Sequence, residues 1–330
     1  MNIVDLHCDT LHELMKQKLK GEHYNLFKRE GHLDVERMLE SGYLVQCFAA
    51  FVDMQQVESS YERGKALAQM YKQLCSEYSP YIAPVHHYQD ILSNERQGLM
   101  SAILTIEEGG VLEGSLENLR EFYETGVRMI TLTWNYPNEI GYPSCLEEIS
   151  IPDTPVNWKV TGEYPGLTKK GIEIVETMEN KGIIIDVSHL SDAGFWDVAM
   201  ITKKPFMASH SNARSICGHK RNLSDAQIRT IAMRGGVIGL NYCAEFLEDN
   251  PEDVTLDSFI RHINHIIRVG GSDVLALGSD FDGIETNPAL PHAGALDHLF
   301  DLMLHSGIAS SVIDKIKGEN ALRMMKEVLR

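Results

Sequence analysis

The chain has 330 residues, of which 43% are hydrophobic and 23% charged, and this composition is typical of a globular protein with a substantial core. Acidic residues outnumber basic residues by 47 to 30, which gives a net charge of −17. Nucleic acids and anionic membranes would repel such a chain, so neither is expected as a partner. The sequence begins without a basic segment followed by an apolar run, and it has no stretch of about 18 apolar residues, so a cytoplasmic location is expected.

The cysteines are scattered along the chain without a C-x-x-C pair, which disfavours both a zinc knuckle and a disulfide framework. In a chain of this length they are predicted to be free thiols in a reducing compartment. They are Cys8, Cys47, Cys75, Cys145, Cys217 and Cys243.

Apolar runs of strand length alternate with stretches of helical periodicity along the chain. Strands are predicted at residues 3–6, 44–52, 100–106, 127–132, 182–187, 205–208, 236–240 and 274–277. Helices are predicted at residues 11–20, 61–77, 116–125, 168–181, 192–201, 224–234 and 256–269, and the remainder is predicted to be helical with breaks at Gly307 and Gly318. Eight strand–helix units favour a closed (β/α)₈ barrel of the TIM type, with an open doubly wound sheet as the alternative.

Residues 136–166 interrupt this alternation with a stretch that is rich in proline and turn residues. Loops of this length in compact domains are usually functional. Because the strand–helix alternation resumes afterwards, the stretch is predicted to be a long loop excursion over a site. Residues 1–330 are therefore predicted to form a single domain.

Side chains that can bind a metal follow several of the predicted strands: His7 and Asp9, Glu107 or Glu108, His189, His210 and Asp280. In a barrel, the carboxyl ends of all strands meet at one face, where active sites of this fold lie. These residues are therefore predicted to converge on a metal centre. Most other histidines are predicted to be surface residues, namely His12, His23, His32, His86, His87, His262, His265, His298 and His305.

Imidazole and carboxylate ligands suit zinc, and also manganese, iron or cobalt. Five ligands exceed the needs of one catalytic zinc ion, which usually has three protein ligands and a water. A carboxylate that bridges two ions divides the set sensibly: His7 and Asp9 would hold the first ion, His189 and His210 the second, and one glutamate both. A hydroxide between two such ions would be a nucleophile near neutral pH.

Six short motifs of the chain resemble, in the same order, the motifs of the membrane (renal-type) dipeptidase family. They lie at residues 5–9 (DLHCD), 106–110 (IEEGG), 185–189 (IDVSH), 209–213 (SHSNA), 221–222 (RN) and 278–283 (GSDFDG). The resemblance extends over residues 1–328, and it implies a (β/α)₈ barrel with a binuclear zinc site that hydrolyses dipeptides.

Carried over position by position, the resemblance implies two Zn²⁺ ions per chain, with His7 and Asp9 on one ion and His189 and His210 on the other. Glu107 would bridge the two ions. Family members commonly have a single glutamate before the two glycines, so Glu108 remains the alternative bridge.

The resemblance also implies roles around the metals. Asp280 matches the family's catalytic acid/base aspartate, and Arg221 matches an arginine that binds substrate. A guanidinium can engage a peptide carboxylate with two hydrogen bonds. Asn135 and Tyr242, which follow two of the predicted strands, are further candidates for substrate binding.

The chain departs from the family pattern at Trp134, where renal-type enzymes have a histidine thought to stabilise the oxyanion. An indole has one N–H donor and cannot supply a cationic imidazolium. Either Asn135 takes this role, the metals suffice, or the activity is weaker or directed to another substrate. An oxyanion donor is worth on the order of 3 kcal/mol, so its loss need not abolish turnover.

The sequence thus predicts a binuclear metallo-dipeptidase that acts on a small dipeptide and that is compatible with a homodimer. The alternative function is a related amidohydrolase that acts on a lactam, a lactone or an N-acyl amino acid. A barrel with a vestigial site, used for binding or assembly, is the alternative outside enzymology.

Overall fold

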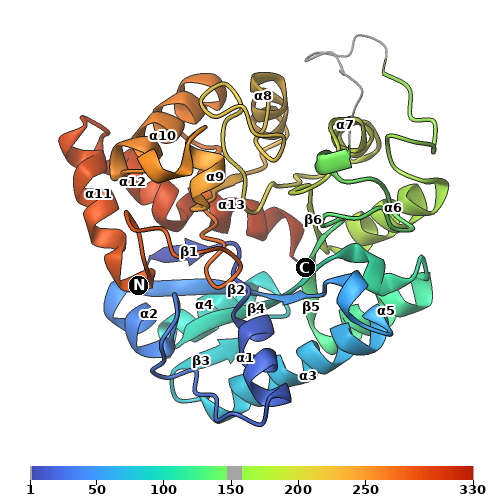
Figure 1. Ribbon diagram of the computed structural model, residues 1–330, viewed down its shortest axis with the longest axis horizontal. Helices are drawn as coiled ribbons and strands as arrows, with labels where there is room; N and C mark the ends of the chain where they lie inside the picture. Colours follow the sequence, from blue (N-terminus) through green and yellow to red (C-terminus); the bar gives the residue numbers. More distant parts are fainter. Residues whose placement is uncertain (1, 147–157, 330) are drawn as a thin grey trace.

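The structure is a computed structural model that describes residues 2–146 and 158–329 (Figure 1). Within them, parallel strands alternate with helices, and the helices surround the strands (Figure 1). The strands are β1 (Ile3–Asp5), β2 (Tyr43–Phe51), β3 (Ile82–Pro84), β4 (Met100–Glu107), β5 (Val127–Thr131), β6 (Ile184–Asp186), β7 (Ile238–Leu240) and β8 (Leu275–Leu277).

The sheet closes on itself as a barrel. Seven strands are joined in the order β6-β5-β4-β2-β1-β8-β7, and their pairings are parallel. The gap between β6 and β7 is spanned by the segment at residues 205–208, in which Met207 bridges Asp186 and Ala208 bridges Ile238. The predicted (β/α)₈ barrel is therefore confirmed.

Two details of the strand prediction differ from the structure. The segment at residues 205–208 pairs with its neighbours through isolated bridges rather than a continuous ladder, and its first residue, Pro205, has no N–H to donate. The short strand β3 was not predicted. It pairs with residues 100–102 of β4 and lies off the path of the ring.

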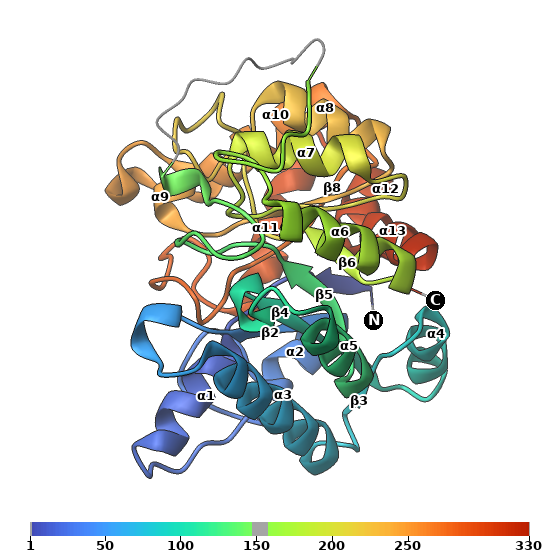
Figure 2. The ribbon, with the colours of Figure 1, turned by 90° about the vertical axis from the view of Figure 1, so that its right-hand side faces the viewer.

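Long helices follow most strands, and Figure 2 shows them packed along the outside of the sheet. The helices are α1 (Thr10–Leu19), α2 (Val35–Ser41), α3 (Ser60–Glu77), α4 (Tyr88–Arg96), α5 (Leu116–Thr125), α6 (Lys169–Lys181), α7 (Asp192–Ile201), α8 (Asp225–Met233), α9 (Ala244–Leu247), α10 (Leu256–Gly270), α11 (Leu296–His305), α12 (Ser310–Asp314) and α13 (Asn320–Val328). Short 3₁₀ turns lie at Met54–Gln56, Gly109–Leu112, Ser144–Leu146, Pro251–Asp253 and Ala293–Ala295, and one π-helical turn at Lys315–Glu319.

Local sequence explains where these helices begin and end. In α6, the side chain of Thr168 accepts a hydrogen bond from the N–H of Gly171, and Gly182 ends the helix in the left-handed conformation at φ 77°. In α10, buried Phe259, Ile263 and Ile266 recur at helical spacing on the face that packs inward.

The core has two parts. The larger cluster lies between the sheet and the helices. The smaller cluster takes side chains from every position of the ring, and side chains from all around a ring can touch one another only inside it. It comprises, among others, Val4, Val45, Ile103, Met129, Ile184, Met207, Val237 and Ala276 together with Met324 and Met325 of α13. The barrel interior is thus packed with side chains, as is usual for this fold.

The predicted loop excursion at residues 136–166 falls partly on residues 147–157, which lie outside the described residues. Its first part packs on the segment after β6: the N–H of Ser144 donates to the carbonyl of His189 (2.7 Å), and Pro143 forms a bridge with Leu190. That the segment restricts the site remains a prediction.

Candidate active site

The side chains predicted to bind metal meet at the carboxyl ends of the barrel strands. His7 and Asp9 follow β1, Glu107 is the last residue of β4, His189 follows β6, and His210 follows the segment at residues 205–208. All of them are buried. Because strands of a closed parallel barrel deliver their ends to one face, residues up to 203 positions apart in the sequence lie within contact distance.

Glu107 lies in the middle of this cluster and faces two sets of side chains. Its Oε2 is 3.0 Å from Nε2 of His7, whereas its Oε1 is 3.0 Å from Nε2 of His189 and 3.5 Å from Nε2 of His210. The two oxygens of one carboxylate thus serve separate groups: His7 with Asp9, and His189 with His210. This is the arrangement that a carboxylate shared by two cations needs.

The imidazoles of His189 and His210 fit a cation between them. Nδ1 of His189 donates to Oδ1 of Asn135 (3.2 Å), and Nδ1 of His210 donates to Oγ of Ser209 (2.7 Å), whose own proton goes to Asp186. Both Nε2 atoms then carry lone pairs, yet they lie only 3.0 Å apart. Two lone pairs at this distance repel each other, and a divalent metal would remove the repulsion.

The group formed by His7 and Asp9 also has buried polar atoms that a metal ion would satisfy. No hydrogen bond reaches either ring nitrogen of His7 or Oδ1 of Asp9, although both side chains are buried. Nε2 of His7 faces Oδ1 of Asp9 at 3.7 Å. Buried polar atoms normally have partners, so these atoms mark a place where a metal ion fits.

Electrostatics differ between the two groups. Burial alone would lower the pKa of His7, but the carboxylates of Glu107 and Asp9 raise it well above its usual value. Burial lowers the pKa of His189 to about 3, with a contribution from Arg221, and it also lowers the pKa of His210. Burial raises the pKa of Asp9 to about 7. Burial would raise the pKa of Glu107, but the charge of His7 and the close contacts with the other two imidazoles outweigh burial and hold that pKa well below its usual value.

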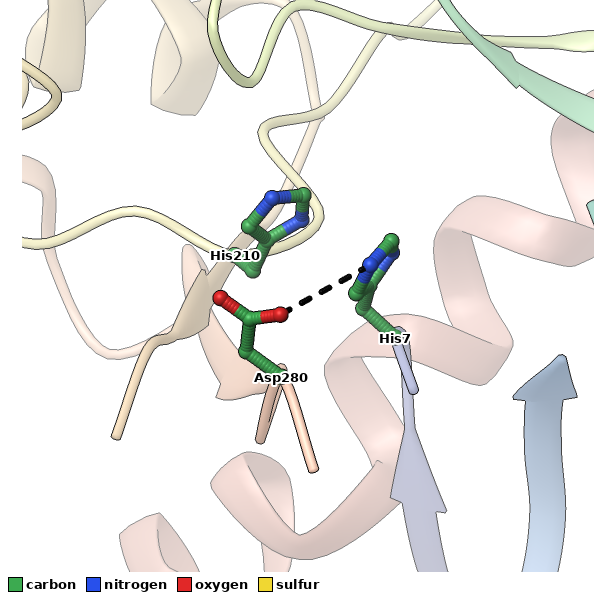
Figure 3. Close-up of side chains that lie close together, drawn as sticks. All are labelled: His7, His210 and Asp280. Carbon is green, nitrogen blue, oxygen red and sulfur yellow. Dashed lines mark ion pairs between the residues drawn. The ribbon is translucent and has the colours of Figure 1, made fainter. Parts of the chain in front are cut away.

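Asp280 lies against the same cluster (Figure 3). Its Oδ1 is 3.8 Å from Nε2 of His7, and its Oδ2 accepts a hydrogen bond from the side chain of Asn241 (3.0 Å). His7, His210 and Asp280 come from different strand ends, and their side chains converge (Figure 3).

The loop that carries Asp280 is held in a strained conformation. Asp280 and Asp282 have φ values of 61° and 65°, which cost of order 1–3 kcal/mol each for residues other than glycine. Asp282 is anchored by Arg29 (2.6 Å) and by the hydroxyl of Thr10 (2.7 Å). Gly283 packs so closely that a Cβ there would overlap the carboxylate of Asp9 and lie 2.6 Å from Oδ1 of Asp280.

Glu108, the alternative bridge, points elsewhere. Its backbone has φ 84°, and its carboxylate accepts hydrogen bonds from the N–H of Gly110 (2.6 Å), from the N–H of Trp134 (2.9 Å) and from the side chain of Asn138. Burial raises its pKa to about 7. Its contacts therefore lie in the loops beside the cluster, and of the two glutamates it is Glu107 that contacts the imidazoles.

A cavity of about 660 Å³ opens over the cluster, which is the size of a small-molecule site. Asp9, Glu107, His189 and Asp280 line its inner end. Its other walls include His12, Lys16, Phe51, Trp134, Asn135, Phe246, Glu245, Glu252 and Glu285.

The remaining predicted site residues take different places. Arg221 is buried; its guanidinium donates to the carbonyl of His210 (3.2 Å) and stacks 5.3 Å from the ring of Phe246, and its Nε has no hydrogen-bond partner. Asn135 lines the cavity and holds His189. Tyr242 is fully buried, its ring packs on Phe259 and Phe281, and it is not among the described residues that line the cavity.

Three histidines predicted to lie on the surface are buried instead, and this part of the prediction is wrong. His262 accepts a hydrogen bond from the N–H of Ala213 and donates to the carbonyl of Leu247, so it joins two loops. His265 pairs with Asp225, and His32 accepts a hydrogen bond from the N–H of Asp282. A buried imidazole with both nitrogens bonded is stable without a metal.

Sequence reasoning missed two kinds of residue. His12 and Phe51 line the cavity, and the position of Phe51 at the carboxyl end of β2 could have identified it. Asp5 and Asp186 are buried carboxylates at the ends of β1 and β6, each two or three residues before a candidate ligand. Their spacing to His7 and His189 was the available signal.

The fold and the cluster together define a class: a (β/α)₈ metallohydrolase with its site at the carboxyl ends of the strands. The family model described as membrane dipeptidase, peptidase family M19, matches residues 1–330. The chain belongs to this family and is a metal-dependent hydrolase of the dipeptidase type. The resemblance inferred from the six motifs is confirmed.

Individual proteins are similar to the chain over most of its length. A protein from the pqqA 5′ region of Klebsiella pneumoniae is 36% identical over 242 residues, which cover 72% of this chain and 86% of the relative. An uncharacterised dipeptidase of Schizosaccharomyces pombe is 29% identical over 343 residues, covering 98% of this chain and 80% of the relative. A metallo peptidase from Rhodobacter sphaeroides, solved with a phosphinate mimic of the dipeptide L-Ala-D-Ala, is 25% identical with a TM-score of 0.88 over 99% of both chains.

The family name includes the word membrane, so membrane-spanning segments are relevant. Among the helices of residues 2–146 and 158–329, none is long and apolar enough to cross a bilayer.

Proposed function

We propose that this chain hydrolyses the peptide bond of dipeptides with two Zn²⁺ ions per chain. The ions would be held by His7 and Asp9 on one side and by His189 and His210 on the other, with Glu107 shared. The observation that carries the proposal is that the two oxygens of Glu107 face separate pairs of side chains, each at 3.0 Å from an imidazole nitrogen.

The chemistry of the ligands supports divalent metal ions. Bound ions would supply Lewis-acid polarisation of the scissile carbonyl and would activate a water molecule near neutral pH. Imidazole and carboxylate ligands are typical of zinc, and the low pKa of His189 keeps its imidazole neutral and available for a metal.

Asp280 is the proposed acid/base. Its carboxylate is close to both His7 and His210, and Asn241 holds its Oδ2, so Oδ1 faces the cluster. In this position Asp280 can take the proton of the attacking water and pass it to the leaving amine. Proton transfer of this kind contributes typically 10²–10⁴-fold to the rate.

Arg221 is the proposed anchor for the substrate carboxylate. Its guanidinium donates to the backbone carbonyl of His210, a candidate ligand, although Arg221 is not among the described residues that line the large cavity. An unpartnered Nε in a buried guanidinium is suited to a charged acceptor. Asn135 is proposed to orient His189, and Tyr242 is left out of the substrate site because its ring is packed in the core.

The proposal also covers the domain organisation, the cellular compartment and the oligomeric state. The whole chain would act as one domain, with residues 136–166 restricting the site. Six free cysteines, four of them buried, suit a reducing compartment, and we propose the cytoplasm. A homodimer is part of the proposal and is checked by light scattering of the purified protein.

The test combines metal analysis with a substrate panel. Protein purified without chelator should contain two zinc ions per chain and hydrolyse dipeptides, and it should do so faster than it hydrolyses lactams, lactones or N-acyl amino acids. Asp280→Asn should keep the metal content and lower kcat by about 10²–10⁴-fold. Wild-type kcat in that variant would contradict the role of Asp280, and turnover restricted to the other substrates would favour the amidohydrolase alternative.

A further inference from the structure

We propose that Trp134, together with Phe51 and His12, forms a subsite for a large apolar side chain, so that the preferred substrates are dipeptides with one aliphatic or aromatic residue. This inference rests on the proposed dipeptidase function and specifies its substrate class.

The three rings form one continuous wall of the cavity. All of them line it, together with Glu107 and His189 of the candidate metal site. The rings of Phe51 and Trp134 meet edge to face with centroids 4.8 Å apart, and those of His12 and Phe51 do so at 4.9 Å. Edge-to-face contacts of this kind stabilise an aromatic surface.

Glu108 and Tyr136 hold Trp134 in position. Its backbone N–H donates to Oε2 of Glu108 (2.9 Å), and Glu108 is itself fixed by the N–H of Gly110 (2.6 Å) and by Asn138. The indole ring also meets the ring of Tyr136 edge to face at 5.6 Å. A positioned ring presents the same surface to every substrate, which is the condition for selectivity.

The wall lies beside the reacting centre. The centroid of the Trp134 ring is 6.4 Å from that of His189. Of the exposed charged residues in the cavity lining, Glu245, Glu252 and Glu285 belong to other segments of the chain, whereas Lys16 lies one helical turn from His12.

The cavity is also large for a small dipeptide. About 660 Å³ lies toward the middle of the range for small-molecule sites and leaves room for a bulky side chain beside the peptide backbone. An indole cannot act as a cationic imidazolium, but its apolar face can exclude water from such a side chain. Trp134 is therefore assigned to substrate selection.

The experiment measures kcat/KM of the zinc-loaded enzyme for Ala-Ala, Leu-Ala, Ala-Leu, Phe-Ala and Ala-Phe, each in its L,L and L,D forms. Either the N-terminal or the C-terminal series should exceed Ala-Ala by at least about tenfold, since one or a few methylenes in an apolar pocket discriminate by about 10–200-fold. Trp134→Ala and Phe51→Ala should remove most of this advantage and change Ala-Ala much less. Met233→Ala, at the exposed end of α8, is the control and should change neither.

Trp134→His separates selection from catalysis. A histidine lacks the area of the indole, so this variant should lose selectivity, whereas Trp134→Phe should retain part of it. A uniform fall in kcat for every dipeptide in Trp134→His and Trp134→Ala, with an unchanged ratio between substrates, would overturn the inference. Inhibition constants for phosphinate mimics of Ala-Ala and of the preferred bulky dipeptide give the same ratio without turnover.

The outcomes also separate this inference from the proposed function. Hydrolysis of all dipeptides with equal kcat/KM leaves the dipeptidase function intact and refutes the subsite. Absence of dipeptide hydrolysis and of mimic binding in zinc-loaded protein refutes both. Circular dichroism and metal content of each variant verify that it is folded, and Phe51→Ala tests the wall independently should Trp134→Ala fail to fold.

Discussion

The two groups of candidate metal ligands are supported by similar carboxylate–serine pairs, but the pKa values of their imidazoles are shifted in opposite directions. On one side, Oγ and N–H of Ser279 donate to the carboxylate of Asp5 (2.6 and 2.9 Å), and this joins β8 to β1. On the other, Oγ and N–H of Ser209 donate to the carboxylate of Asp186 (2.6 and 2.8 Å), and this joins the segment at residues 205–208 to β6. Each buried pair connects neighbouring strand ends that carry site residues.

Asp186 has more donors than Asp5. The hydroxyl of Thr131 (2.6 Å) and the N–H of Ser188 (3.0 Å) also donate to Asp186. Burial would raise its pKa, but His210 and these hydrogen bonds outweigh burial and lower it. Burial raises the pKa of Asp5, because the bonds from Ser279 and His7 are too few to compensate.

The neighbouring imidazoles also differ in the direction of their pKa shifts. The pKa of His7 is raised because carboxylates surround it, whereas burial lowers the pKa of His189 and His210. In the metal-free protein, protonation is therefore favoured at His7 and disfavoured at His189 and His210. Similar carboxylate–serine pairs thus support two groups of candidate ligands that favour different protonation states.

The largest effect is expected from Glu107→Gln, which affects both sides at once. A glutamine offers one oxygen, so one side loses its shared ligand and faces an N–H₂ group instead. Zinc content should fall below two per chain and kcat/KM should fall by more than about 100-fold, beyond the 10–100-fold loss typical of a residue that only supports a ligand. Glu108→Gln is the matched control and should keep both ions; loss of metal in it would contradict the assignment of Glu107 as the shared ligand.

The next largest effect is a difference in stability loss between substitutions in the two carboxylate–serine pairs, Asp186–Ser209 and Asp5–Ser279. At pH 7 in metal-free protein, Asp186→Asn should lower the free energy of unfolding by about 2–3 kcal/mol, since hydrogen bonds to a charged group are lost. Asp5→Asn should cost less than about 1 kcal/mol, because the hydroxyl of Ser279 can turn to the carbonyl of His7 at 3.1 Å. Urea unfolding measures both, and equal losses would refute the difference between the pairs.

The pH dependence of that stability has opposite signs for the two residues. The lowered pKa of Asp186 contributes stability that is present above the unfolded pKa, near 4, and is lost as the pH falls through the folded value. The raised pKa of Asp5 makes its ionised form unfavourable in the folded state, so its contribution falls as the pH rises from about 4 through the folded pKa. The two Asn variants should therefore diverge as the pH increases.

Proton release on zinc binding should differ between the sides. In His210→Ala the His7 side remains complete, and binding there must displace the proton of His7 and, near pH 7, part of that of Asp9. In His7→Ala the neutral imidazoles bind without such a loss. Calorimetry in buffers of different ionisation enthalpy should show about one more proton released in His210→Ala, or about a tenfold steeper change of affinity per pH unit. Equal proton release would contradict the comparison.

A small effect is expected from Thr131→Val, which makes the Asp186 side more like the Asp5 side. Removal of one hydroxyl donor should cost about 1 kcal/mol in urea unfolding. In the Asp186→Asn background the same substitution should cost much less, because the charged acceptor is already absent. Additive losses would mean that Thr131 stabilises the protein through another contact.

The sequence by itself determined the barrel and the set of candidate ligands. Alternating apolar runs predicted eight strands, and parallel strands must deliver their carboxyl ends to one face. His7, His189, His210 and Asp280 could therefore be grouped without coordinates.

Only the tertiary structure shows which of Glu107 and Glu108 contacts the imidazoles, namely Glu107. The two are adjacent, and a backbone φ of 84° turns Glu108 toward Trp134 and away from the imidazoles. It also revealed the pairs at Asp5 and Asp186, the aromatic wall of the cavity, and the buried positions of His32, His262 and His265. These features depend on which strand ends and loops are neighbours in space, and periodicity along a single chain does not contain that information.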